Sequence, residues 1–254
     1  MAAVSVFERI AKHQRWYVLA GLAVVAIVGL LATLHTGDML MMAEPEGGSV
    51  VAYALLLFAM WWTMMMAMML PSAAPAILTY GALSSKFSAN GGSAAPLGFF
   101  VAGYALIWTG FSAAAVALQL LTADIIALSM MMAVRSVVIG GVLLVAAGLY
   151  QLSPLKAVCL KKCQSPLMFL GRNWQSGNHG ALRMGLSHGF YCLGCCWVLM
   201  GLLFYGGVME LRWIVGLALY VAAEKLIPAG NRLSQFTGVL LVGWGCWTIF
   251  RAFM

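Results

Sequence analysis

The sequence predicts an all-α protein, a polytopic membrane helix bundle with about seven transmembrane helices, and three observations lead to this fold class. The composition is 63% hydrophobic and only 8% charged, with a mean hydropathy of +0.96, whereas soluble domains are roughly one quarter charged. The apolar residues form continuous runs of about 20 residues, the length that crosses the hydrocarbon layer. These runs lack strand-like alternation, and helices satisfy their own backbone hydrogen bonds in lipid.

Seven runs qualify as spanning helices, and the 254 residues are predicted to form a single transmembrane domain. The first run follows a basic N-terminal segment and is longer than the apolar core of a signal peptide, so it is predicted to be an uncleaved helix. The sixth run is short and ends at Glu224-Lys225. The predicted helices lie at about residues 16–35, 50–70, 97–121, 134–152, 185–208, 212–228 and 236–252.

Two long connections separate these helices, and both are predicted to be cytoplasmic loops. Residues 71–96 contain Pro71, Pro96 and other turn-forming residues but little charge. Residues 153–184 carry much of the positive charge of the chain.

The distribution of Lys and Arg predicts the orientation of the bundle. With the N-terminus in the cytoplasm, the inner segments hold Arg9, Lys12, Arg15, Lys86, Lys156, Lys161, Lys162, Arg172, Arg183, Lys225 and Arg232, and the outer segments hold Arg135, Arg212 and Arg251. Eleven inner charges against three fit the positive-inside rule and place the C-terminus outside. The net charge of +7 therefore reflects topology, and no nucleic acid partner is expected.

The second predicted helix is rich in methionine. Residues 60–69 contain six methionines, and Met64 and Met68 share one face of the helix while Met65 and Met69 share another. Two thioethers on adjacent turns can bind one soft ion such as copper(I). Methionine is also a flexible filler of cores, so packing is the plainer interpretation of each one.

The fifth predicted helix carries a stripe of sulfur and imidazole. The spacing i, i+4 and i+7 places His188, Cys192 and Cys195 within a sector of about 60°, with Cys196 at its edge. Thiolate, thioether and imidazole together form the ligand set of copper(I). Single buried cysteines are common packing residues, but a set of three beside a histidine in a membrane helix favours a metal site.

In the predicted topology, the methionines of the second helix and the histidine and cysteines of the fifth lie at a similar depth in the membrane. The second helix runs inward and the fifth outward, so both sets of ligands fall in the cytoplasmic half of the membrane. Cys159 and Cys163 follow from the loop beneath, where they share a face if the segment is helical and could receive or release an ion. Glu224 and Lys225 are predicted to be a satisfied pair of charges at the inner interface, with Glu224 as an acceptor that orients His188 as the alternative. Cys246, in the last helix, is predicted to be a packing residue.

Four segments resemble an uncharacterised bacterial family of predicted metal-binding integral membrane proteins, over roughly residues 50–250. They are Met68-Met69-Leu70-Pro71, the run Tyr150 to Lys156 that leads to Cys159 and Cys163, Ser187-His188-Gly189 followed by Cys192, and Glu224-Lys225-Leu226 with Pro228. The resemblance implies a multi-pass protein of the bacterial inner membrane with suspected metal ligands. It implies no established reaction.

Three functions remain open on the sequence alone. The first is copper(I) handling by binding, transfer or delivery, with a membrane metalloenzyme or larger membrane complex as partner. No nucleotide-binding motif is present, and a binding role is favoured over an enzymatic one. The second is a thiol–disulfide electron carrier, because Cys192 and Cys195 have C-x-x-C spacing. The third is an accessory subunit whose sulfur residues only pack.

Overall fold

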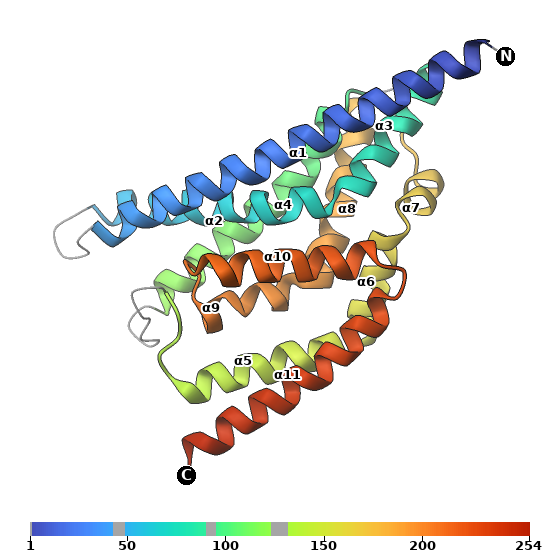
Figure 1. Ribbon diagram of the computed structural model, residues 1–254. Coiled ribbons are helices and arrows are strands. Elements are labelled where there is room, and N and C mark those ends of the chain that lie inside the picture. Colours follow the sequence, from blue (N-terminus) through green and yellow to red (C-terminus); the bar gives the residue numbers. More distant parts are fainter. Residues whose placement is uncertain (1, 43–48, 90–94, 123–131) are drawn as a thin grey trace.

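The computed structural model describes residues 2–42, 49–89, 95–122 and 132–254, and its regular elements over these ranges are α-helices (Figure 1). In chain order they are α1 (Ala2–Met42), α2 (Val50–Ser72), α3 (Ala74–Ala89), α4 (Leu97–Leu121), α5 (Val137–Gln151), α6 (Pro154–Gln164), α7 (Pro166–Arg172), α8 (Gly177–Gly201), α9 (Leu203–Gly206), α10 (Leu211–Leu226) and α11 (Gly230–Ala252). The predicted all-helical fold class is confirmed.

Five helical segments are long and apolar enough to cross a membrane: Val18–Leu40 within α1, α2, α4, the segment Gly177–Gly206, and α11. A sixth results if α5 and α6, which meet at an angle of 64°, are counted as one bent span. The remaining predicted helix corresponds to α10, whose 16 residues extend about 24 Å, short of the roughly 30 Å of hydrocarbon. The structure thus describes five or six candidate spans where the sequence predicts about seven.

The two connections predicted as loops contain helices of their own. Residues 71–96 include α3, and residues 153–184 include α6, α7 and the first turns of α8. Helix α6 begins where the side chain of Ser153 accepts a hydrogen bond from Lys156 N and Pro154 occupies the first turn. These short helices give Cys159 and Cys163 fixed positions in the fold.

Glycines allow two pairs of helices to pack at very short distance. A Cβ added to Gly185 of α8 would overlap the carbonyl oxygen of Phe100 in α4, and one added to Gly103 of α4 would overlap that of Leu182 in α8. In the α5–α11 pair, a Cβ on Gly148 would lie 2.6 Å from Gly238 O. Small residues are the usual means of close helix packing in membrane bundles.

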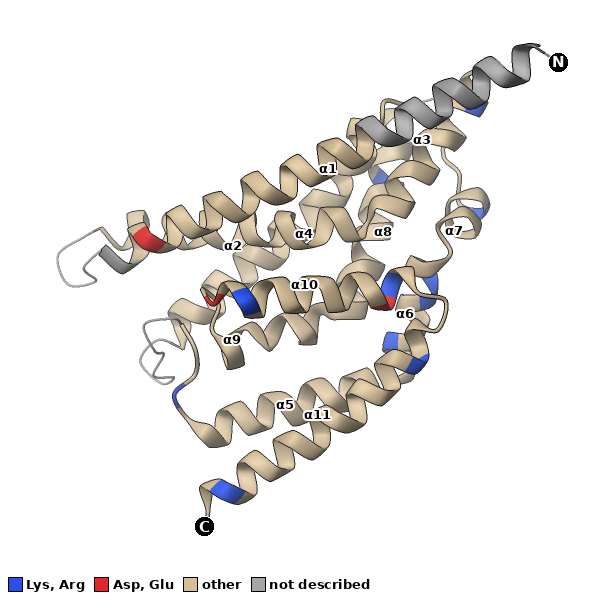
Figure 2. Ribbon diagram, in the orientation of Figure 1, with Lys and Arg blue, Asp and Glu red and all other residues tan. Residues whose placement is uncertain are grey.

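Positive charge gathers at one end of the bundle. Figure 2 shows most Lys and Arg at the end that carries α3, α6 and α7, and fewer at the end that carries α9 and the C-terminus. Two of the eleven residues counted as inner charges are nevertheless buried, with Lys156 0% and Lys225 6% exposed. They are therefore structural or functional charges, and the orientation of the bundle stays a prediction that rests on the others.

Candidate metal centre

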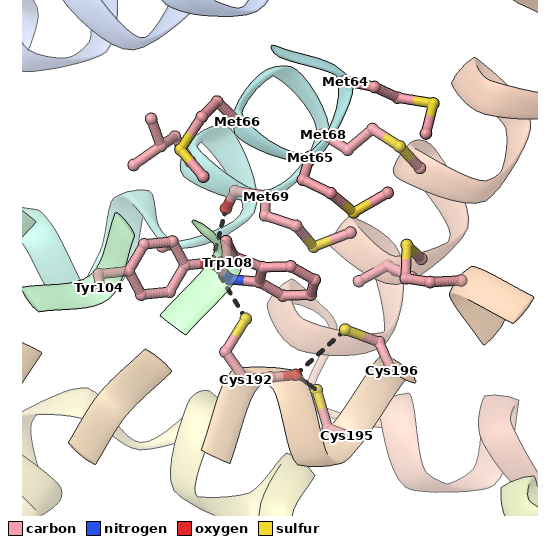
Figure 3. Close-up of a cluster of buried hydrophobic side chains, with 14 of the residues drawn as sticks. Met64, Met65, Met66, Met68, Met69, Tyr104, Trp108, Cys192, Cys195 and Cys196 are labelled. Atoms are coloured by element: carbon pink, nitrogen blue, oxygen red, sulfur yellow. Dashed lines mark hydrogen bonds between the residues drawn. The ribbon is translucent and has the colours of Figure 1, made fainter. Parts of the chain in front are cut away.

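The methionine segment of α2 lies in the core. Met60, Met64, Met65 and Met69 are 0% exposed, and Met66 and Met68 are at most 5% exposed. In Figure 3 the thioethers of Met64, Met65, Met68 and Met69 extend to one side of α2, and that of Met66 extends to the other. Helix α2 contacts α4 and α10, and both of these helices also contact α8. The four predicted ligands therefore face the region that leads to the thiols.

The three cysteines of α8 are buried but point in different directions. Cys195 Sγ and Cys196 Sγ each donate a hydrogen bond to the carbonyl oxygen of Cys192, at 3.1 Å in both cases. Their thiols are thereby turned to the backbone of their own helix, as the dashed lines of Figure 3 show. Of the three, Cys192 presents its sulfur to residues of other helices.

Cys192 Sγ is bound by two side chains that also reach the end of α2. Lys225 Nζ in α10 donates to Cys192 Sγ at 3.0 Å and to Ser72 Oγ at 2.9 Å, and it lies 4.0 Å from Met69 Sδ. The Tyr104 hydroxyl lies 3.0 Å from Cys192 Sγ and 3.0 Å from Met69 O, to which it donates a hydrogen bond. We call Met69, Ser72, Tyr104, Cys192 and Lys225 the Cys192–Lys225 cluster.

The cluster has chemistry suited to a soft cation. A charge-assisted hydrogen bond from an ammonium group stabilises a thiolate, which is the metal-binding form of cysteine. A thioether from Met69 lies against the same ammonium group. Thiolate with thioether selects copper(I) over hard cations.

Helix α6 adds two more buried cysteines to this region. Cys159 and Cys163 are 9% and 8% exposed, and their helix α6 packs against α8. Cys159 lies against Gly194 of α8, where an added Cβ would lie 2.9 Å from its sulfur. The structure thus places five buried thiols on two adjacent helices.

His188 lies one turn before Cys192 in α8, in an aromatic environment. Its side chain is 3% exposed, and the rings of Phe100, Tyr104 and Phe169 surround it with centroid distances of 6.1, 5.9 and 5.8 Å. Its Nδ1 atom has no hydrogen-bond partner. Among the residues that the structure describes, no three His, Cys, Asp or Glu side chains are arranged to hold a metal ion.

Sequence reasoning missed the charged residue of the cluster. The sequence predicts Lys225 to be an inner charge that pairs with Glu224, and this pair is wrong: the structure directs Lys225 to Cys192 and pairs Glu224 with Lys156 at 2.8 Å. Glu224 is thus a satisfied charge, and its carboxylate does not bond to His188. Ionisable residues are rare within apolar helices and usually mark function, so the position of Lys225 in such a helix was the available signal. Cys246, predicted to pack, is exposed.

Comparison with protein families gives a match over residues 58–248 to the family PpoB2, whose members are described as copper chaperones. The chain belongs to this copper chaperone family. Neither a curated protein nor a solved structure matches the chain. The match assigns copper handling in general terms and agrees in extent with the segment that carries the metal-binding resemblance.

The copper chaperone match includes every residue that the sequence predicts as a ligand. These are Met64, Met65, Met68, Met69, Cys159, Cys163, His188, Cys192, Cys195 and Cys196. It also includes Tyr104 and Lys225, whereas α1 lies entirely outside it. The part of the chain shared with copper chaperones is therefore the part that holds the buried sulfur atoms.

Proposed function

We propose that this protein is a multi-pass membrane protein that binds copper(I) at Cys192 and Met69 and passes it to an acceptor protein. The observation that carries the proposal is the Cys192–Lys225 cluster, in which one ammonium group contacts the thiol of α8 and the thioether of α2. A thiol and a thioether, two kinds of sulfur ligand that copper(I) favours, thus lie against the same buried ammonium group. Membership of the copper chaperone family supports copper as the ion.

The remaining sulfur residues have supporting roles in this proposal. Met64, Met65 and Met68 extend to the same side of α2 as Met69 and supply weak neutral ligands along the way to Cys192. By rotating about χ1, the side chains of Cys195 and Cys196 can break their hydrogen bonds to the backbone and bind the ion instead. Cys163 and Cys159 then receive or release copper on the side of α6. His188, with a free Nδ1 atom, is a ligand for a neighbouring position on this route.

We infer a location in the bacterial inner membrane, with the N-terminus in the cytoplasm. Five or six helices of sufficient length and apolar composition support a membrane location. Large apolar side chains such as Leu31, Leu121 and Leu219 are more than half exposed, as lipid-facing residues are. A membrane metalloenzyme or a larger membrane complex is the partner that this location favours.

A thiol–disulfide electron carrier is the second candidate function. It is favoured by the packing of α6 against α8, which places buried thiols on two adjacent helices. The five cysteines of these helices are buried, so dithiol exchange with a partner and copper transfer would both require the bundle to open. Membership of the copper chaperone family favours copper handling over dithiol exchange.

Copper analysis of the purified protein tests the proposal. The reduced protein in detergent is loaded with copper(I), desalted and compared with Cys192→Ser and with Cys246→Ser as a matched control. We expect near-stoichiometric copper in the wild type and the control and its loss in Cys192→Ser. Absence of copper from the wild type would contradict the proposal. Copper retained at full affinity by Cys192→Ser would move the site elsewhere.

A further inference from the structure

The ammonium group of Lys225 contacts both sulfur atoms of the proposed copper site. Its Nζ atom is 3.0 Å from Cys192 Sγ, 2.9 Å from Ser72 Oγ and 4.0 Å from Met69 Sδ. Lys225 is 6% exposed, and Met69 and Cys192 are 0% and 1% exposed. A thiol, a hydroxyl and a thioether thus surround a monovalent cation, and this cation is part of the protein.

No carboxylate balances this charge in the part of the chain that the structure describes. The ion pairs there are Lys156–Glu224 and Glu210–Arg212. Glu224 is the neighbour of Lys225 in sequence, but both of its carboxylate oxygens accept hydrogen bonds from Lys156. A buried ammonium group without a partner is strongly disfavoured, so Cys192 Sγ serves as its acceptor.

We propose that Lys225 is a built-in competitor of copper, whose ammonium group holds the cation position between Cys192 and Met69 until copper(I) displaces it. The inference rests on the proposed copper site at these two residues. Two positive charges repel each other strongly at a few ångströms in an interior of low polarity, so the lysine and the ion cannot share the sulfur atoms. Binding copper therefore includes the work of moving Lys225 away.

Competition between Lys225 and copper is useful in a protein that must release its ion to an acceptor. Lys225 is tethered to α10, so its local concentration at the sulfur atoms stays high whatever the concentration of copper. Each time copper begins to leave Cys192, the ammonium group can take its place and restore the charge balance. Lys225 thereby lowers the affinity for copper and speeds its release.

Exchange of Lys225 for a neutral side chain of similar length tests this role. The full-length protein in detergent, reduced and free of oxygen, is titrated with copper(I) against a chromophoric copper(I) chelator, and release to excess chelator is timed. Lys225→Met should bind copper about tenfold more tightly or better, and release it correspondingly more slowly. Lys225→Arg, which keeps the charge, should stay close to the wild type. Lys161→Met, the same exchange at an exposed lysine of α6, serves as control.

Thermal unfolding of each variant separates this role from a purely structural one. Equal melting temperatures with different dissociation constants for Lys225→Met and Lys225→Arg would support competition. If Lys225→Met does not fold, Lys225→Gln provides a neutral side chain that can still bond to Ser72. Unchanged or weaker copper binding in the neutral variant, with wild-type binding intact, would overturn the inference and leave the proposed function standing. A wild type that binds no copper would overturn both.

Discussion

Met69 and Cys192 are separated by more than one hundred positions in sequence, and two side chains connect them. The hydroxyl of Tyr104 bonds to Met69 O and contacts Cys192 Sγ, and the ammonium group of Lys225 reaches both sulfur atoms. These contacts fix the rotamer of Cys192 and the end of α2 before any ion is present. The Tyr104 contacts can persist when Lys225 moves away, so they preorganise Met69 and Cys192 for the proposed copper site.

Replacement of Met69 by leucine should weaken copper binding without unfolding the protein. Leucine and methionine have similar volumes, so the exchange in a core costs less than about 1.5 kcal/mol. Met69→Leu removes the thioether beside Lys225 and should raise the dissociation constant for copper(I) about tenfold. Met66→Leu, at a residue of equal chemistry that extends to the other side of α2, should leave it unchanged. Equal effects of the two exchanges in a chelator competition titration would contradict a specific role for Met69.

Loss of the Tyr104 hydroxyl should loosen the cluster. Tyr104→Phe removes one of the two side-chain donors of Met69 O, the other being Ser72 Oγ, and one partner of Cys192, which should lower the free energy of unfolding by about 0.5–1.5 kcal/mol. The freed sulfur should also react faster with a small maleimide. Thermal unfolding and alkylation followed by mass spectrometry measure the two effects, and an unchanged alkylation rate would show that the hydroxyl does not hold Cys192.

At the scale of elements, the contact of α4 with α8 depends on two glycines. Tyr104 follows Gly103 directly, and Gly185 lies one turn before His188 and two before Cys192. Because an added Cβ at either glycine would overlap backbone of the opposite helix, only glycine lets the two helices approach this closely. The same approach delivers the Tyr104 hydroxyl to Cys192.

Substitution of Gly185 by alanine should therefore separate α4 from α8. The methyl group would collide with Phe100 O, and overpacking of this kind costs about 1–3 kcal/mol or more. Gly110→Ala in α4 is the matched control, because an added Cβ there meets nothing within 4 Å. Detergent-solubilised Gly185→Ala should melt at a lower temperature and lose copper, whereas Gly110→Ala should behave as the wild type. Equal melting temperatures would show that the helices can adjust.

Helix α10 links the two helices that carry thiols. Two consecutive residues point to different neighbours: Glu224 bonds to Lys156 in α6, and Lys225 bonds to Cys192 in α8. Glu224 also accepts hydrogen bonds from Gln151 and Tyr220, so the buried pair belongs to a larger polar network. This network fixes α6, and with it Cys159 and Cys163, against the bundle.

Removal of the negative charge of Glu224 should loosen the packing of α6 against the rest of the bundle. Glu224→Gln leaves the buried ammonium group of Lys156 unpaired, a change that costs about 3–5 kcal/mol. Cys159 and Cys163 should then react with maleimide more readily than in the wild type. Glu210→Gln breaks an exposed pair with Arg212 worth less than about 1 kcal/mol and should change neither property. Restored stability in Glu224→Gln/Lys156→Met would confirm that the unpaired charge is the cause.

At the scale of the whole molecule, the sequence predicts the helices that follow from continuous apolar runs. It misses the features that depend on contacts between helices far apart in the chain. The apolar runs predict α1, α2, α4, α5, α8, α10 and α11 because lipid requires continuous apolar helices. The α3 and α6 segments, of 16 and 11 residues, are too short to be recognised as spans, and their prolines resemble turn signals although Pro154 begins a helix. Burial of Lys156 and Lys225 depends on acceptors from distant helices, which no local pattern reveals.

The predicted orientation can be tested with fused reporters. An alkaline phosphatase placed after Met254 should be active in a bacterial host, because the C-terminus is expected outside the cytoplasm, and a fluorescent protein placed there should stay dark. The reverse pattern would invert the topology. It would also assign the end of the bundle that carries α6 to the outer face.

If copper(I) binds at the Cys192–Lys225 cluster as proposed, the depth of the cluster determines the kinetics of copper transfer. Met69, Cys192 and Lys225 are at most 6% exposed, so no acceptor protein can touch the ion while the helices are closed. Transfer must wait for a local opening of the bundle, an event that the protein undergoes at its own rate. As the acceptor concentration rises, the transfer rate should therefore level off at this opening rate. The same barrier shields bound copper(I) from oxygen and from soluble thiols between deliveries.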